Sequence, residues 1–154
     1  MDLDQDLLDF ITALNHAEVH YLVVGGISVI IHGYARTTMD LDIWVERSYT
    51  NYQNLVKAFA EFGMPVFDMT AENFLNNNDL DVFTFGRPPV CIDLMNRVKG
   101  LEFTSAYQSA ITMELNNCPV KVISKADLIK AKRAAGRHKD LDDVEHLENK
   151  NANR

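Results

Sequence analysis

The sequence repeats one short acidic pattern, Asp-Leu-Asp, four times. The copies are at residues 2–4, 40–42, 79–81 and 140–142. On a β-strand, two carboxylates at this spacing point to the same face, with Cα atoms about 6.5–7 Å apart, and together they can bind a hard divalent cation. On a helix the two side chains diverge. The secondary structure around each copy therefore decides which one could support metal chemistry.

The second copy has the most suitable setting for this chemistry. The first lies at a helix start, where acids suit the helix dipole, and the fourth opens or lies within a helix. The third follows the polar run 76–78, where a solvated turn is the simpler interpretation. Asp40 and Asp42 instead enter an apolar strand over 41–45. The alternative for this pair is a solvent-facing edge strand.

Two glycines before this strand could bind phosphate. Gly25 and Gly26 end the apolar strand 21–24, and a short apolar helix over 27–32 follows. Glycines let a phosphate approach the backbone, the helix start offers free N–H groups, and Ser28 can add a hydroxyl. The anion cradle and the carboxylate pair together predict a site for a metal–polyphosphate complex. A plain strand-to-helix turn is the alternative.

These motifs resemble the core of the nucleotidyltransferase superfamily, whose fold is that of DNA polymerase β. The resemblance rests on Val24-Gly25-Gly26, thirteen intervening residues, and then Asp40-Leu41-Asp42-Ile43. Members carry a third acid on a later strand, and Asp93 in the apolar run 91–94 matches it. Residues 35–38 and 132–140 are similar to the small, uncharacterised and abortive-infection-type branches. The resemblance covers roughly residues 20–147.

The resemblance implies a reaction. Asp40, Asp42 and Asp93 would be the catalytic residues and the ligands of two Mg²⁺ ions, with Mn²⁺ as the alternative. Asp93 would either bind the second ion or take the proton from the attacking hydroxyl. A nucleoside monophosphate would move from ATP or another nucleoside triphosphate to an acceptor hydroxyl, with release of pyrophosphate. The acceptor is open: a small molecule such as an antibiotic, an RNA end or a protein.

The expected nucleotide-binding residues are Gly25, Gly26, Ser28, Arg36, Thr38 and Lys132. Arg36 could hold phosphate or pair with nearby acids. Lys132 is the preferred phosphate contact because the family motif has a lysine there. Six of the fifteen basic residues lie between Lys125 and Lys139, and a solvated amphipathic helix is the alternative interpretation of this segment. For Asp93, the alternative is a buried acid paired with Arg87 or Arg97.

Hydrophobic periodicity predicts the elements that position these residues. We expect helices over 6–16, 27–32, 52–62, 125–136 and 139–148, and strands over 21–24, 41–45, 80–85, 90–94 and 120–123. A hairpin turn at 86–89 joins two of the strands, and a further helix precedes the last strand. Ser124 is the expected N-cap of the first C-terminal helix. The predicted class is α/β (α+β): a nucleotidyltransferase fold with a small mixed β-sheet flanked by helices and two C-terminal helices.

Length and composition limit the remaining possibilities. The 154 residues fit a single domain over 1–148, with a disordered tail over 149–154. The net charge of −7 disfavours a general nucleic-acid coat. No apolar run approaches the roughly 20 residues of a membrane helix, so no membrane contact is expected. Two cysteines without a Cys-x-x-Cys motif, and an acidic N-terminus, favour the reducing cytoplasm.

A second class of function fits the same motifs. The chain could be a nucleotide-binding regulatory or toxin–antitoxin component that keeps the fold with little or no turnover. The complete set of acids argues against this, whereas the small size favours it. A homodimer or a partner protein could also cover the site and supply acceptor contacts.

Overall fold

The computed structural model describes residues 3–35, 40–87 and 90–149, which form seven helices and six strands. The helices are α1 (Gln5–His16), α2 (Gly25–Ile31), α3 (Tyr49–Phe62), α4 (Ala71–Leu75), α5 (Phe103–Gln108), α6 (Lys125–Ala135) and α7 (His138–Glu148). The strands are β1 (Tyr21–Val24), β2 (Asp40–Val45), β3 (Val82–Arg87), β4 (Val90–Met95), β5 (Ile111–Leu115) and β6 (Cys118–Val122).

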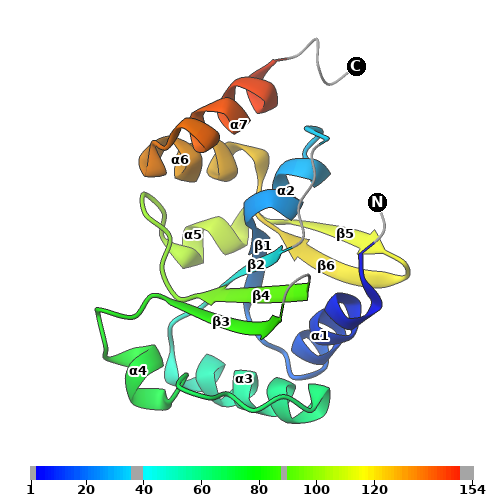
Figure 1. Ribbon diagram of the computed structural model, residues 1–154, viewed down its shortest axis with the longest axis vertical. Helices are drawn as coiled ribbons and strands as arrows, with labels where there is room; N and C mark the ends of the chain where they lie inside the picture. Colours follow the sequence, from blue (N-terminus) through cyan, green and yellow to red (C-terminus); the bar gives the residue numbers. More distant parts are fainter. Residues whose placement is uncertain (1–2, 36–39, 88–89, 150–154) are drawn as a thin grey trace.

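The strands form one mixed sheet in the order β3-β4-β2-β1-β6-β5 (Figure 1). Strand β2 is parallel to β4 and antiparallel to β1, while β1 is parallel to β6. The pairs β3–β4 and β5–β6 are antiparallel hairpins at the two edges. Because β2 lies inside the sheet, the edge-strand alternative for Asp40 and Asp42 is wrong.

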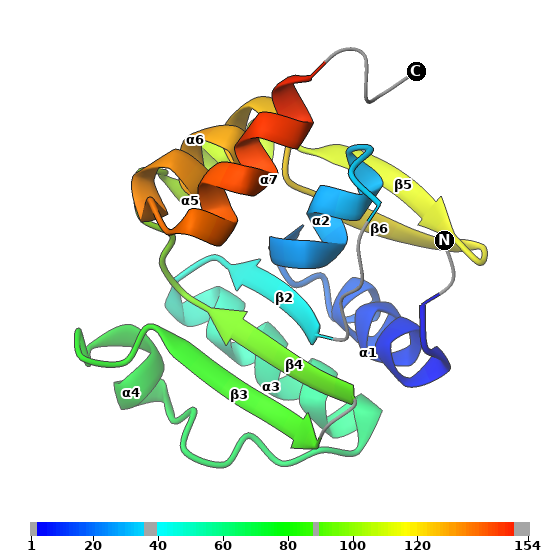
Figure 2. The same ribbon diagram turned by 45° about the horizontal axis from the view of Figure 1, so that its top comes forward.

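Helices cover both faces of the sheet (Figures 1 and 2). Helices α1, α3 and α4 contribute to the larger core cluster, which includes Phe10, Phe59 and Phe74. Helices α5, α6 and α7 contribute Ala106, Leu128 and Leu147 to a second cluster on the other face. The molecule therefore has three layers, with the sheet in the middle.

Strand β2 shows how the sequence sorts its side chains between these layers. Leu41, Ile43 and Val45 are fully buried in the larger cluster. Asp42 and Trp44 alternate with them and face the second layer, where Trp44 is buried. The apolar half of the alternation fixes the register, and this in turn fixes where the acids point.

Most predicted elements are confirmed, and so is the fold class. Ser124 caps α6, since its Oγ accepts a hydrogen bond from Asp127 N at 3.2 Å. The β3–β4 pairing confirms the hairpin, although residues 88–89 of its turn lie outside the described residues. The glycine pair does not end β1 as a separate turn but begins α2 directly.

Two elements were not predicted: α4 and β5. Helix α4 is only five residues long and buries a single side chain, Phe74, so it has little periodicity to detect. Strand β5 is an edge strand with mostly exposed side chains. Its hairpin with β6 turns at Asn116 and Asn117, which both have positive φ, as a two-residue hairpin loop requires.

The end of the chain is described as far as Asn149. Asn149 follows α7, and its N–H donates to Glu145 O at 3.1 Å. The rest of the expected tail lies outside the described residues. None of the helices in the described ranges is long and apolar enough to span a membrane.

Candidate active site

The parallel pairing of β2 and β4 brings the predicted acids onto neighbouring positions of the sheet. Asp42 is the register partner of Asp93, and on its other side it is the partner of Val24 at the end of β1. Asp40, two residues before Asp42 on β2, is the register partner of Cys91 and is exposed. The strongest juxtaposition is therefore the pair Asp42 and Asp93.

The electrostatics of Asp42 reflect this crowding. The pKa of Asp42 is raised to about 6, mainly by burial and then by the charge of Asp93, a hydrogen bond with Asp93 and the charge of Asp40. The positive charge of Lys132 acts in the opposite direction. Two carboxylates held this close favour either a shared proton or a cation.

Asp93 is oriented by a neighbour that the sequence analysis did not identify. Thr84, its register partner on β3, donates a hydrogen bond from Oγ1 to Asp93 Oδ1 at 2.7 Å. Arg97, proposed as an alternative partner, instead pairs with Asp81 at 3.4 Å. No ion pair joins Asp93 to Arg87 among the described residues. Thr84 thus holds one oxygen of Asp93, while the same carboxylate also contacts Asp42.

The glycine turn packs directly against the acids. Gly25 has φ +67°, and a Cβ added there would lie 2.8 Å from Cβ of Asp42 and closer still to its carboxylate. Only glycine fits this position. Ser28 lies fully buried below the turn, where its hydroxyl donates to Gly25 O at 2.7 Å. The structure thus places Ser28 as a support of the turn and not among the residues that line the site.

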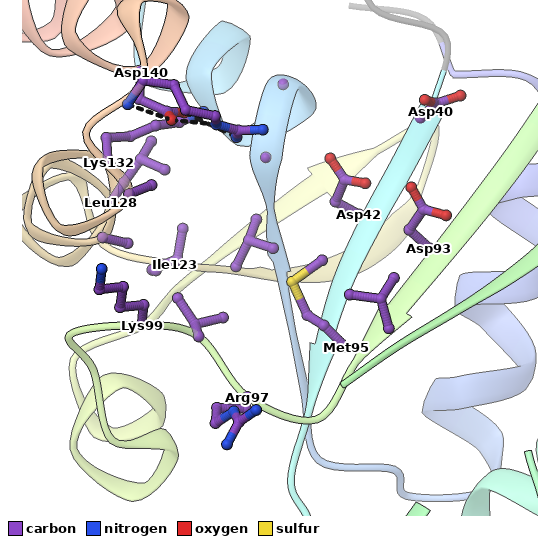
Figure 3. A pocket seen from close by; sticks show the side chains of 18 of the residues that line it. Asp40, Asp42, Asp93, Met95, Arg97, Lys99, Ile123, Leu128, Lys132 and Asp140 are labelled. Atoms are coloured by element: carbon purple, nitrogen blue, oxygen red, sulfur yellow. Dashed lines mark hydrogen bonds and ion pairs between the residues drawn. The ribbon is translucent and has the colours of Figure 1, made fainter. Parts of the chain in front are cut away.

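The acids and glycines line a cavity of about 600 Å³ (Figure 3). Asp40, Asp42 and Asp93 lie on one side, and Lys132 and Lys99 lie on the opposite side. Apolar side chains also line the cavity, among them Met95, Ile123 and Leu128. A cavity with carboxylates facing cations across apolar side chains suits a metal–triphosphate with an attached base.

Lys132 is held at this cavity by two buried carboxylates of α7. Its Nζ lies 3.1 Å from Asp143 Oδ2 and 3.4 Å from Asp140 Oδ1, and both carboxylates are almost fully buried. Burial raises the pKa of Asp140, but the hydrogen bond from Arg137 and the charge of Lys132 outweigh it and lower the pKa overall. Asp143 is a site residue that the sequence analysis missed. Lys132 departs from the solvated-helix alternative for the segment 125–139, because its side chain is only 11% exposed, whereas Lys130, Arg133, Arg137 and Lys139 are exposed.

The carboxylates at this cavity meet part of what a hard divalent cation requires. Asp42 and Asp93 offer adjacent carboxylate oxygens, and a divalent ion would relieve the repulsion that raises the pKa of Asp42. In the described ranges, no three acidic, His or Cys side chains are close enough to hold a metal. Asp40, as placed in the structure, therefore does not complete a three-carboxylate metal site with Asp42 and Asp93. Arg36 and Thr38 lie outside the described residues.

The mixed sheet, with its glycine turn and paired acids, has the arrangement of a nucleotidyltransferase fold. The chain belongs to the family "nucleotidyltransferase of unknown function (DUF6036)", whose profile matches residues 1–150. The protein is thus a nucleotidyltransferase, as its motifs predicted. No curated protein matches it in sequence.

Two solved structures share the fold. Lincosamide antibiotic adenylyltransferase LnuA, solved with lincomycin bound, is 15% identical with a TM-score of 0.59, over 96% of this chain and 98% of that one. An antigenic nucleotidyltransferase-like protein from Paracoccidioides brasiliensis is 14% identical with a TM-score of 0.52, over 92% of this chain and 74% of that one. At these identities the likeness shows the fold alone.

Proposed function

We propose that this protein transfers a nucleoside monophosphate from ATP to a hydroxyl of a small molecule in a reaction that depends on Mg²⁺. The observation that carries the proposal is the pairing of Asp42 with Asp93, opposite the anchored Lys132 in one cavity. The adenylyl transfer named for the fold neighbour LnuA makes ATP the first donor to test.

Asp42 and Asp93 would hold the metal, with Mn²⁺ as a substitute, and Asp40 would join them when its exposed side chain turns toward the triphosphate. Bound Mg²⁺ would neutralise the triphosphate and stabilise the entering and leaving oxygens. Because Asp93 Oδ1 accepts from Thr84, its other oxygen would face the acceptor or the metal once an ion replaces the hydrogen bond with Asp42.

The chain's own groups have separate tasks in this proposal. Lys132 would bind phosphate oxygens, and Gly25 and Gly26 would let them approach the backbone. Asp93 would accept the proton as the acceptor O–H bond breaks. The acceptor oxygen would then bond to the α-phosphorus while the bond to the pyrophosphate oxygen breaks.

The test is calorimetric binding of the four common nucleoside triphosphates with Mg²⁺, followed by pyrophosphate release with candidate acceptors. The wild type should bind ATP, and the Asp40→Ala/Asp42→Ala variant should not. Retained transfer by that variant would contradict the proposal. Binding without pyrophosphate release from any acceptor would favour the regulatory or toxin–antitoxin alternative.

A further inference from the structure

Strand β3 forms the edge of the sheet beside the two paired acids and supplies neither of them. It is antiparallel to β4, and β4 is parallel to β2. In this register Asp93 lies between Asp42 on one side and Thr84 on the other. Side chains of register partners project from the same face of a sheet. Thr84, Asp93 and Asp42 therefore form one row across three neighbouring strands, and Figure 3 shows its two acids side by side.

The hydroxyl of Thr84 is the contact that orients Asp93. Its Oγ1 donates to Asp93 Oδ1 at 2.7 Å, a usual length for an O–H···O bond. Among the described residues, the carboxylate of Asp93 has one further hydrogen bond, with Asp42. A bond between two carboxyl groups needs a proton on one of them, so a divalent cation that displaces this proton also removes the bond. Thr84 then remains as the hydrogen-bond donor to Asp93.

The packing of β3 holds Thr84 in place without burying it. Phe83 and Phe85, on either side of it, are each 3% exposed and belong to the larger core cluster on the opposite face. Phe85 also packs edge-to-face on Phe59, with ring centroids 4.9 Å apart. The β-branched side chain of Thr84 has few χ1 rotamers. The hydroxyl is thus held beside Asp93 by its strand and by its own stiffness.

Strand propensity alone could account for a threonine at an exposed strand position. Thr112 is such a case, because it is exposed on β5, the opposite edge strand, and has no side-chain hydrogen bond among the described residues. Thr84 is also exposed but differs by its bond to Asp93. The two residues therefore form a matched pair for testing what this bond contributes.

We propose that Thr84 is a positioning residue of the metal site, and that its hydroxyl sets the affinity for the metal–nucleotide complex by fixing the orientation of Asp93. The inference rests on the proposed function, because Asp93 is a metal ligand only in that proposal. Groups that orient a metal ligand without touching the metal typically contribute about 10–100-fold to metal affinity.

The test is calorimetric binding of ATP, once with Mn²⁺ and once in EDTA. Thr84→Val removes the hydroxyl and keeps the branched shape. We expect the Kd for MnATP to rise about tenfold. The Kd for ATP in EDTA should not change, because without a metal the nucleotide does not depend on the orientation of Asp93. An unchanged Kd for MnATP, or an equal rise under both conditions, would overturn the proposal.

Two further variants separate the hydroxyl from the fold. Thr84→Ser keeps the hydroxyl and should restore most of the affinity for MnATP, whereas Thr112→Val should leave the Kd at the wild-type value. All variants should unfold in urea near the wild-type midpoint, because both positions are exposed. A loss of affinity that serine does not restore, or that follows a loss of stability, would mean a structural role and would overturn the proposal.

The wild type and Asp93→Asn distinguish a failure of this inference from a failure of the proposed function. No binding of MnATP to the wild type would overturn both. Binding that is lost in Asp93→Asn but unchanged in Thr84→Val would overturn the role of Thr84 and leave the metal site intact. Loss in both variants, with rescue by Thr84→Ser, is the result that we expect.

Discussion

At the scale of single residues, the proposed chemistry depends on the charge of Asp42. Its carboxyl is pressed between Gly25 and Asp93, and its pKa is raised from 3.8 to about 6. The folded protein therefore binds more protons than the unfolded chain between these two values. Stability from this group is present below pH 3.8 and is lost as the pH rises through about 6.

The first prediction concerns Asp42→Asn without metal. The variant carries no charge at this position, so at pH 8 it should be more stable than the wild type by about 1–3 kcal/mol. The difference should disappear below pH 4. Urea unfolding across this pH range in EDTA measures it. Asp79→Asn, in an exposed copy of the same tripeptide, is the control and should show no such gain.

The second prediction concerns Gly25→Ala. The added Cβ would displace Asp42, so transfer should fall by about two orders of magnitude, as a misplacement near 1 Å can cause. Gly63→Ala is a matched control, because Gly63 also has positive φ (+88°) but has open space around it. It should lose stability by about 1–2 kcal/mol and keep its activity. Equal activity in the two variants would refute the close approach of Gly25 to Asp42.

At the scale of elements, the C-terminal helix pair acts as one unit through Lys132. The lysine comes from α6, and the two carboxylates around it come from α7. Separating the two helices would leave these buried charges without compensation, which is costly. The same contact holds Lys132 at the cavity that Asp42 and Asp93 line.

The third prediction separates these two roles of Lys132. Lys132→Met leaves buried carboxylates with less compensation and should lower the free energy of unfolding by about 3–5 kcal/mol. Adding Asp143→Asn should restore part of the stability but not ATP binding. Denaturation and calorimetry measure the two effects. Lys130→Met, at an exposed position of the same helix, should change neither, and restored ATP binding in the double variant would exclude a phosphate role for Lys132.

At the scale of the whole molecule, the larger core cluster and the candidate site lie on opposite faces of the sheet. The larger cluster lies on the face that α1 and α3 cover (Figure 2). Asp42 and Asp93 line a cavity together with residues of α2, α6 and α7. A change in the far layer should therefore act on unfolding and leave the site intact.

The fourth prediction uses ligand-induced stabilisation. MgATP at one hundred times its Kd should stabilise the wild type by about 2.7 kcal/mol, seen as a rise in Tm. Phe59→Ala, in the far layer, should lower stability by about 3–5 kcal/mol and keep this rise. Asp93→Asn should keep its basal stability within about 1 kcal/mol and lose the rise. A full MgATP response in the Asp93→Asn variant would contradict the metal site.

The sequence determined much of the fold and the identity of the main site residues. Gly25-Gly26 and Asp40–Asp42 could be located because a glycine turn and a strand carboxylate pair are local patterns. The spacing of Asp40 and Asp42 on a strand also predicted that both side chains point to the same face. Helix α4 and strand β5 escaped prediction because one is very short and the other is an exposed edge strand, so neither has a strong periodic signal.

Only the tertiary structure decided which distant residues meet. The parallel register of β2 and β4 places Asp93 beside Asp42, and β3 brings Thr84 to Asp93. The packing of α7 on α6 surrounds Lys132 with Asp140 and Asp143. These contacts depend on strand order and helix packing, which no local pattern encodes. The sequence therefore determined the chemical groups of this nucleotidyltransferase, and the tertiary structure decided their partners, because burial and charge depend on neighbours far away in the chain.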